Sequence, residues 1–82
     1  MKYEIEIKPR ALKDLHALPS DEMRRISARI DRMANDLEGD VKQLRNFTPS
    51  YRMRYGDYRV LFEVDGNRVV IYRVRHRRDA YR

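Results

Sequence analysis

Arginine is the reactive side chain that dominates the second half of this chain. Ten arginines stand between residues 45 and 82, against four acids, Asp57, Glu63, Asp65 and Asp79. A guanidinium binds a phosphate through two parallel hydrogen bonds and stacks on nucleic-acid bases. The net charge of +6 therefore favours a polyanionic partner, either a nucleic acid or an acidic protein.

Two side chains in the last eight residues of the chain can exchange protons as well as bind anions. They are His76 and Tyr81, and arginines surround both. A basic terminus is also typical of a frayed chain end, so both interpretations stay open. His16 is interpreted as a surface or packing residue. Two distant histidines and no cysteine give no metal-ligand spacing, and no Ser/His/Asp or Cys/His nucleophile arrangement is visible.

The elements that must position these residues begin with a strand and two helices. Residues 3–7 alternate apolar and charged side chains, which predicts a strand whose apolar residues face a core. A helix is predicted over 9–18, because proline can open a helix and apolar residues recur there at helical spacing. A second helix is predicted over 20–37, with Ser20 as N-cap and Gly39 as C-cap.

The remaining chain predicts a small sheet. Residues 41–50 are expected to be an irregular approach to it. Strands are predicted at 51–55, 58–64 and 68–75, joined by two-residue turns at Gly56-Asp57 and Asp65-Gly66. The order is β-α-α-β-β-β and the fold class is α+β, a single domain over 1–82 in which a helical hairpin packs on one face of the sheet. The last three strands form an antiparallel meander.

The two turns also predict which side chains face one another. The first turn sets Arg54 opposite Arg59, and the second sets Arg59 opposite Tyr72. Arg52 lies two residues from Arg54, so these residues share the face away from the helices. Like charges opposite one another disfavour a sheet, which predicts an anion held between them. The alternatives are solvated surface charges, or pairing with acids from elsewhere in the chain.

Four segments of the chain resemble the RelE family of toxin ribonucleases, within the wider group that includes ParE toxins. They are KPRALKDL at 8–15, LR at 44–45, YRMRYGDYRV at 51–60 and VRHRRDAY at 74–81. The resemblance covers essentially the whole chain and rests on the order and spacing of all four. It implies a RelE-like fold and a toxin of a type II toxin–antitoxin system. Such a toxin enters the ribosomal A site, cleaves the mRNA there and is neutralised by a cognate antitoxin protein.

The resemblance also implies which residues act. The positions carried over as catalytic are Arg52, Arg54, Arg59, Arg77 and Tyr81. The residues expected to bind RNA beside them are Arg45, Tyr72, Arg75, His76 and Arg78. The first two catalytic positions are lysines in the best-known members of the family. Because arginine stays protonated, any base must lie elsewhere in this chain.

The implied reaction is attack of the RNA 2′-OH on the adjacent phosphorus, without a metal or other cofactor. Arg52, Arg54 and Arg59 would form an electrostatic clamp, and Arg77 would hold the scissile phosphate and help stabilise the leaving group. Tyr81 would be the general base if the arginines stabilise its phenolate. Otherwise it would be a platform on which an RNA nucleobase stacks. His76 is the rival acid or base.

Two alternatives come from other functional classes. One is a ParE-like inhibitor of DNA gyrase without nuclease activity, and the other is a non-catalytic module that binds RNA or an antitoxin. No stretch approaches the roughly 18 apolar residues of a membrane span. The first residues contain no apolar signal-peptide core, so we expect a cytoplasmic protein with no membrane partner. The absence of cysteine agrees with that expectation.

Overall fold

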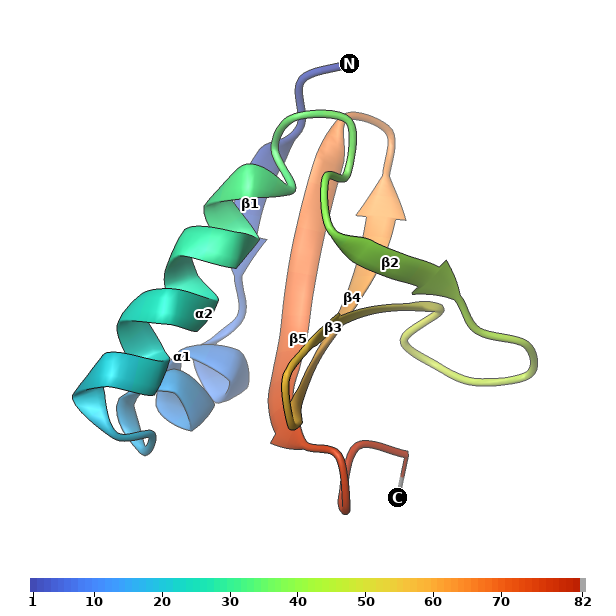
Figure 1. The fold of residues 1–82 in the computed structure, drawn as a ribbon. Coiled ribbons are helices and arrows are strands. Elements are labelled where there is room, and N and C mark those ends of the chain that lie inside the picture. Colours follow the sequence, from blue (N-terminus) through green and yellow to red (C-terminus); the bar gives the residue numbers. More distant parts are fainter. Residues whose placement is uncertain (82) are drawn as a thin grey trace.

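The computed structural model describes residues 1–81 as a helical layer packed on one face of a sheet (Figure 1). The elements are β1 Glu4–Ile7, α1 Pro9–His16, α2 Ser20–Arg32, β2 Asp40–Gln43, β3 Tyr51–Tyr55, β4 Tyr58–Asp65 and β5 Arg68–His76. The sheet order is β1-β5-β4-β3-β2, with β1 parallel to β5 and the other pairs antiparallel. The predicted α+β architecture, with its helical hairpin on one face of the sheet, is confirmed.

The sheet contains a strand that the sequence did not predict. The segment 41–50 was expected to be irregular, but β2 begins one residue before it and pairs antiparallel with β3. Val41 is its one apolar residue, so the strand carries no alternating pattern. Its hydrogen-bonding partner, rather than its own sequence, specifies it. The added strand places Asp40 and Lys42 beside the predicted arginine cluster.

The second helix is shorter than its apolar stripe suggests. It ends at Arg32, and Met33 is its C-cap. Beyond it, Asp36 and Leu37 adopt left-handed φ angles of 54° and 57°, so the chain is not helical up to the predicted C-cap, Gly39. The predicted N-cap residue is instead the first residue of the helix. These differences leave the packed face of the helix unchanged.

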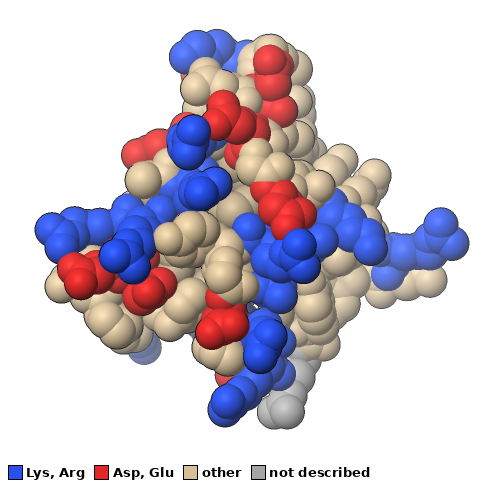
Figure 2. All heavy atoms as spheres, in the orientation of Figure 1, with Lys and Arg blue, Asp and Glu red and all other residues tan. Residues whose placement is uncertain are grey.

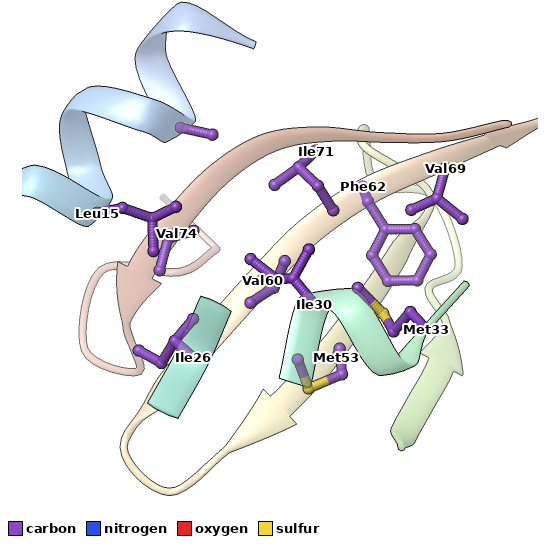
Figure 3. Close-up of a cluster of buried hydrophobic side chains, with 11 residues drawn as sticks. Leu15, Ile26, Ile30, Met33, Met53, Val60, Phe62, Val69, Ile71 and Val74 are labelled. Carbon is purple, nitrogen blue, oxygen red and sulfur yellow. The ribbon is translucent and has the colours of Figure 1, made fainter. Parts of the chain in front are cut away.

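The core lies between α2 and the sheet, with α1 closing one end. Ile26, Ile30 and Met33 of the α2 region point toward Met53, Val60, Phe62 and Ile71 of the sheet (Figure 3). Phe62 is fully buried, and burial of such a side chain stabilises the fold by about 1.5–3 kcal/mol. The first strand differs from its prediction in two respects, because it begins at Glu4 rather than at residue 3 and because Ile7 is 37% exposed.

The first hairpin has the predicted register. Tyr55 pairs with Tyr58 and Arg54 with Arg59, so the loop is Gly56-Asp57. Gly56 has a φ of 54°, the left-handed conformation that such a turn requires and that glycine adopts without strain.

The second hairpin is displaced from its prediction. Asp65 pairs with Arg68, so the turn is Gly66-Asn67, one residue later than expected. A β-bulge between Leu61 and Phe62 shifts the register again farther along. The predicted pairing of Arg59 with Tyr72 is therefore wrong.

The face of the sheet away from the helices is partly covered. Leu61 and Val70 are 2% and 5% exposed, although neither belongs to the core cluster under the helices. The loop 44–50 and the C-terminal tail, residues 77–81, both lie on this side (Figure 1). No helix within residues 1–81 is long and apolar enough to cross a membrane.

Candidate functional site

A row of arginines crosses three strands on the outward face of the sheet. Arg54 of β3 pairs with Arg59 of β4, and Arg59 pairs with Arg75 of β5. Asp40 of β2 pairs with Arg54 and forms one end of the row. Like charges directly opposite one another destabilise a sheet, so the fold concentrates positive charge here at a cost of some tenths of a kcal/mol per pair.

Asp40 relieves part of this repulsion. Its Oδ2 accepts a hydrogen bond from Arg54 Nε at 2.7 Å, and its Oδ1 accepts one from Arg52 Nη1 at 3.1 Å. The same Arg52 nitrogen donates to the backbone oxygen of Asp40 at 2.8 Å. The hydrogen bonds from Arg52 and then Arg54 hold the pKa of Asp40 below its usual value. Arg52 and Arg54 therefore pair with an acid from elsewhere in the chain, which is one of the alternatives that the sequence left open for the cluster.

Arg59 is held by backbone carbonyls. Its Nη1 donates to the oxygen of Gly56 at 3.0 Å and to that of Tyr58 at 2.9 Å. Those bonds fold the side chain back toward the β3–β4 turn. A guanidinium carries five N–H donors, so others can still bind an anion.

Residues 77–81 turn back over the outward face of the sheet, so they do not form the frayed chain end that the sequence left open. The backbone N–H of Arg77 donates to the oxygen of Asp57 at 2.7 Å. Ala80 is 1% exposed, and the ring of Tyr81 meets that of Phe47 edge-on at 5.4 Å. The tail is therefore packed against the fold and brings a titratable side chain over the sheet.

An open pocket of about 390 Å³ lies where the tail, the loop 44–50 and the β2–β3 pair meet. Its six lining residues are Lys42, Leu44, Arg45, Phe47, Arg52 and Tyr81. Three of these were predicted as site residues from regions far apart in the sequence. Lys42 and Phe47 were missed because both fall in the segment expected to be irregular, although a lone phenylalanine in a polar stretch is itself a signal of contact.

Other predicted site residues lie outside this pocket. Arg77 Nε is 3.7 Å from Asp57 Oδ1, with both side chains 64% exposed. Arg78 is exposed, and its backbone N–H donates to His76 Nδ1 at 3.3 Å. Figure 2 shows basic side chains gathered at the end of the molecule where β5 passes into the tail, with acidic ones among them.

His76 and Tyr72 lie apart from the arginine row. His76 pairs with Tyr58, which packs against the core, so alternation places it on the helix side of the sheet. The two rings meet edge-on at 5.7 Å. Tyr72 lines a second pocket, of about 540 Å³, and the ammonium of Lys8 lies 5.9 Å from its ring centroid. The prediction that Tyr72 lies beside the arginine cluster is therefore wrong.

Within residues 1–81 no group of three or more His, Cys, Asp or Glu side chains is placed to hold a metal ion. The polar groups that line the pocket are the guanidinium groups of Arg45 and Arg52, the ammonium of Lys42 and the phenol of Tyr81. Guanidinium groups fixed around a concave surface can bind a phosphodiester, and the other two groups can exchange protons with it.

Comparisons with known proteins agree with this fold. A family model described as the ParE toxin of type II toxin–antitoxin systems, parDE, matches residues 5–81. Toxin RelE3 of Methanocaldococcus jannaschii is 35% identical over an alignment of 75 residues, and the match covers 85% of this chain and 85% of that protein. Toxin RelG of Mycobacterium tuberculosis is 33% identical over 89 residues, covering 100% of this chain and 99% of that protein.

A solved structure supports the same grouping. The toxin–antitoxin complex RelBE2 of Mycobacterium tuberculosis matches with a TM-score of 0.82 and 27% identity, covering 93% of this chain and 99% of that chain. The chain belongs to the RelE/ParE superfamily and is a toxin of the type II toxin–antitoxin class. Within that superfamily, the resemblance to RelE toxins is confirmed by the names of these relatives.

Proposed function

We propose that this toxin is a ribosome-dependent endoribonuclease that cleaves mRNA in the A site and so blocks translation in the cytoplasm. The observation that carries the proposal is the pocket that joins Arg45, Arg52 and Tyr81. It combines fixed cations with a proton-exchanging phenol on a concave surface, next to a row of further arginines. The cations suit binding of an RNA phosphodiester, and the phenol adds the proton exchange that its cleavage needs.

The reaction begins with removal of the proton from a ribose 2′-OH. The 2′-oxygen then bonds to the adjacent phosphorus while the bond from phosphorus to the 5′-oxygen breaks. The 5′-oxygen takes up a proton, which leaves a 2′,3′-cyclic phosphate and a 5′-hydroxyl. Negative charge accumulates on the phosphoryl oxygens in the transition state, so preorganised cations accelerate the step.

Arg52 and Arg54 form the proposed clamp, with Arg59 beside them. Asp40 holds the first two in place before RNA arrives, which avoids the cost of ordering them during the reaction. The side chain of Arg77 is exposed, and an RNA phosphate can replace its distant partner Asp57. Arg77 therefore remains the proposed contact to the scissile phosphate.

Tyr81 is the proposed base, with stacking on a nucleobase as its alternative role. The edge-on contact with the Phe47 ring limits where the phenol ring of Tyr81 can lie, so its hydroxyl has a defined position in the pocket. His76 is the weaker candidate because it lies on the helix side of the sheet. Arg45, Arg75 and Arg78 are proposed to bind the flanking RNA.

A cognate antitoxin is the second proposed partner. Solved relatives such as RelBE2 of Mycobacterium tuberculosis are toxin–antitoxin complexes. The net charge of +6 on this chain suits an acidic or amphipathic peptide that covers the arginine row. Such a peptide would neutralise the toxin by occupying the RNA site.

The test is to map mRNA 5′ ends after incubation with translating ribosomes. Wild-type protein should cut the message, and the double variant Arg77→Ala/Tyr81→Phe should leave it intact. Tyr55→Phe is the matched control, since it removes a phenol hydroxyl from the helix side of the sheet. Intact message with wild type and variant alike would refute the nuclease.

The ParE name of the matching family model makes gyrase inhibition the alternative to exclude. Plasmid supercoiling by gyrase should be unaffected by the wild-type protein. Loss of supercoiling without mRNA cleavage would establish the ParE-like function. Binding to RNA with neither effect would establish a non-catalytic binding module. Rapid cleavage of naked RNA by the pure protein would contradict dependence on the ribosome.

A further inference from the structure

The arginines of the clamp do not account for one requirement of the proposed reaction, which is a donor for the proton that the departing 5′-oxygen takes up. A guanidinium stays protonated through the reaction, so arginines are poor proton donors. Of the six residues that line the pocket, only Lys42 and Tyr81 carry groups that readily exchange a proton. If Tyr81 takes the proton from the 2′-OH, the donor has to be sought at Lys42.

Lys42 is the third residue of β2 and pairs directly with Arg52 of β3. It shares the outward face of β2 with Asp40, since side chains two residues apart point the same way. Its ammonium therefore enters the pocket beside a clamp arginine, from a strand that the sequence did not predict.

The charge partners of these residues differ. Arg52 and Arg54 are hydrogen-bonded to Asp40, which fixes them. Among residues 1–81 no carboxylate pairs with Lys42, and its side chain is exposed to the pocket opening. An ammonium without an internal partner can turn toward a leaving oxygen, whereas a paired guanidinium is better suited to a fixed electrostatic role.

The rest of the chain offers no comparable lysine near this pocket. The other three lysines stand at positions 2, 8 and 13. Lys8 pairs with Glu6 at 3.1 Å and lines the other pocket. Lys13 belongs to α1, on the helix side of the sheet.

The positions of the two proton carriers also suit the displacement. The attacking and leaving oxygens lie on roughly opposite sides of the phosphorus in an in-line reaction. The base and the acid must then come from different walls of the site. Tyr81 belongs to the tail and Lys42 to β2, so the pocket supplies one group from each wall.

We propose that Lys42 is the general acid, a catalytic residue that donates an ammonium proton to the 5′-oxygen as its bond to phosphorus breaks. The proposal rests on the proposed nuclease function. The electron pair of the breaking bond goes to the 5′-oxygen, which takes the proton from Nζ and leaves as a hydroxyl. Lys42 ends the step as a neutral amine and regains its proton from water.

The decisive variant is Lys42→Arg, which keeps the positive charge but removes the proton donor. Single-turnover cleavage on programmed ribosomes is measured with two mRNAs that differ only at the scissile bond. One has the normal 5′-oxygen, and the other has a bridging sulfur, which leaves as a stable thiolate and needs no proton. A general acid contributes typically about 10²- to 10⁴-fold.

The expected result is a loss of about 100-fold or more with the oxygen substrate and nearly wild-type cleavage of the sulfur substrate. Glu38→Gln is the control for net charge near β2, because Glu38 pairs with Arg32 of α2 and lines no part of the pocket. It should leave both rates unchanged. Lys42→Ala should additionally raise the toxin concentration needed for half-maximal cleavage.

Two results would overturn the proposal while leaving the nuclease intact. If Lys42→Arg cleaves the oxygen substrate at the wild-type rate, charge alone is needed at this position. If both substrates slow by the same factor, Lys42 acts in binding or positioning. Wild-type protein that cuts neither substrate would refute the nuclease and the role of Lys42 together.

Discussion

Replacement of Asp14 by asparagine should destabilise the fold in a pH-dependent way. Asp14 lies on α1, and its carboxylate accepts a backbone hydrogen bond from β5 beyond the end of β1. β1 pairs with β5 only as far as Ile71, and beyond it the backbone N–H of Val74 donates to Asp14 Oδ2 at 2.9 Å. Arg73 adds two bonds to the same carboxylate, from Nε at 2.8 Å and from Nη2 at 3.2 Å. The carboxylate therefore fastens α1 to the strand that carries Arg75.

The magnitude follows from these three contacts. The side chains of Asp14 and Arg73 are 18% and 26% exposed, so water screens the pair only partly. A hydrogen bond to a charged group contributes about 1.5–3 kcal/mol when buried. Asparagine keeps one acceptor oxygen but loses the charge and the two-bond geometry, so we expect a loss of about 1–2 kcal/mol. For a domain of this size, each kcal/mol corresponds to roughly 4–8 °C in melting temperature.

The pH dependence of this loss has a defined sign. Partial burial works to raise the pKa of Asp14, but the bonds from Arg73 and Val74 outweigh it, and the pKa lies below the ordinary 3.8. A carboxyl with a depressed folded-state pKa contributes stability above its unfolded value and loses it as the pH falls through the folded value. The difference between wild type and Asp14→Asn should be constant from pH 7 to pH 5 and should shrink progressively as the pH falls below the ordinary value of 3.8.

Urea unfolding at pH 7, 5, 4 and 3, followed by circular dichroism, measures this difference. Glu6→Gln is the matched control, because Glu6 forms exposed ion pairs with Lys8 and Arg68. That variant should leave the free energy of unfolding nearly unchanged. Equal stability of wild type and Asp14→Asn at pH 7 would refute the assigned role. So would a difference that persists undiminished at pH 3.

Three further substitutions test the site and its scaffold. Asp40→Asn should slow cleavage and steepen the salt dependence of RNA binding, because the arginines lose their anchor and gain net charge; unchanged values in both assays would contradict this. Phe47→Ala should slow cleavage by about tenfold by freeing the ring of Tyr81, and an unaffected rate would show that the contact is incidental. Gly66→Ala should cost about 1 kcal/mol in urea unfolding, since Gly66 has a φ of 60°, whereas no loss would place the turn in another conformation.

The sequence predicted those parts of the sheet in which turn chemistry alone sets the register. Gly56-Asp57 joins two strands without a bulge, so the predicted pair of Arg54 and Arg59 is correct. In the second hairpin the turn lies one residue later than predicted, and a bulge follows near Leu61. Moving the turn by one residue shifts the cross-strand partners by two residues, and the bulge shifts them once more from Leu61 onward. Tyr72 was therefore assigned to the wrong neighbours.

The edge strand β2, which forms one side of the site, could not be predicted from sequence patterns for a different reason. β2 has four residues with one apolar side chain, so its conformation depends on pairing with β3. The prediction of the arginine cluster left open whether acids from elsewhere pair with it, and Asp40 is that acid. The position of Lys42 in the pocket was not predictable for the same reason, because it depends on the pairing of β2 with β3 and not on a sequence motif. Hydrophobic periodicity identifies elements that bury one face, but an edge strand that buries few side chains shows little periodicity in its sequence.

The composition of the pocket has a kinetic consequence that separates the proposed roles. Arginine does not change its charge between pH 5 and pH 9, so the clamp contributes a constant to the rate. Any pH dependence must then come from groups that exchange protons, and those in the pocket are Tyr81 and Lys42. The single-turnover rate should rise with pH as the base loses its proton, and Tyr81→Phe should abolish that rise. His76→Gln should leave the profile unchanged, because His76 lies on the other side of the sheet. If His76→Gln instead abolished the rise while Tyr81→Phe kept it, the histidine would be the base, and the tail would have to move when RNA binds.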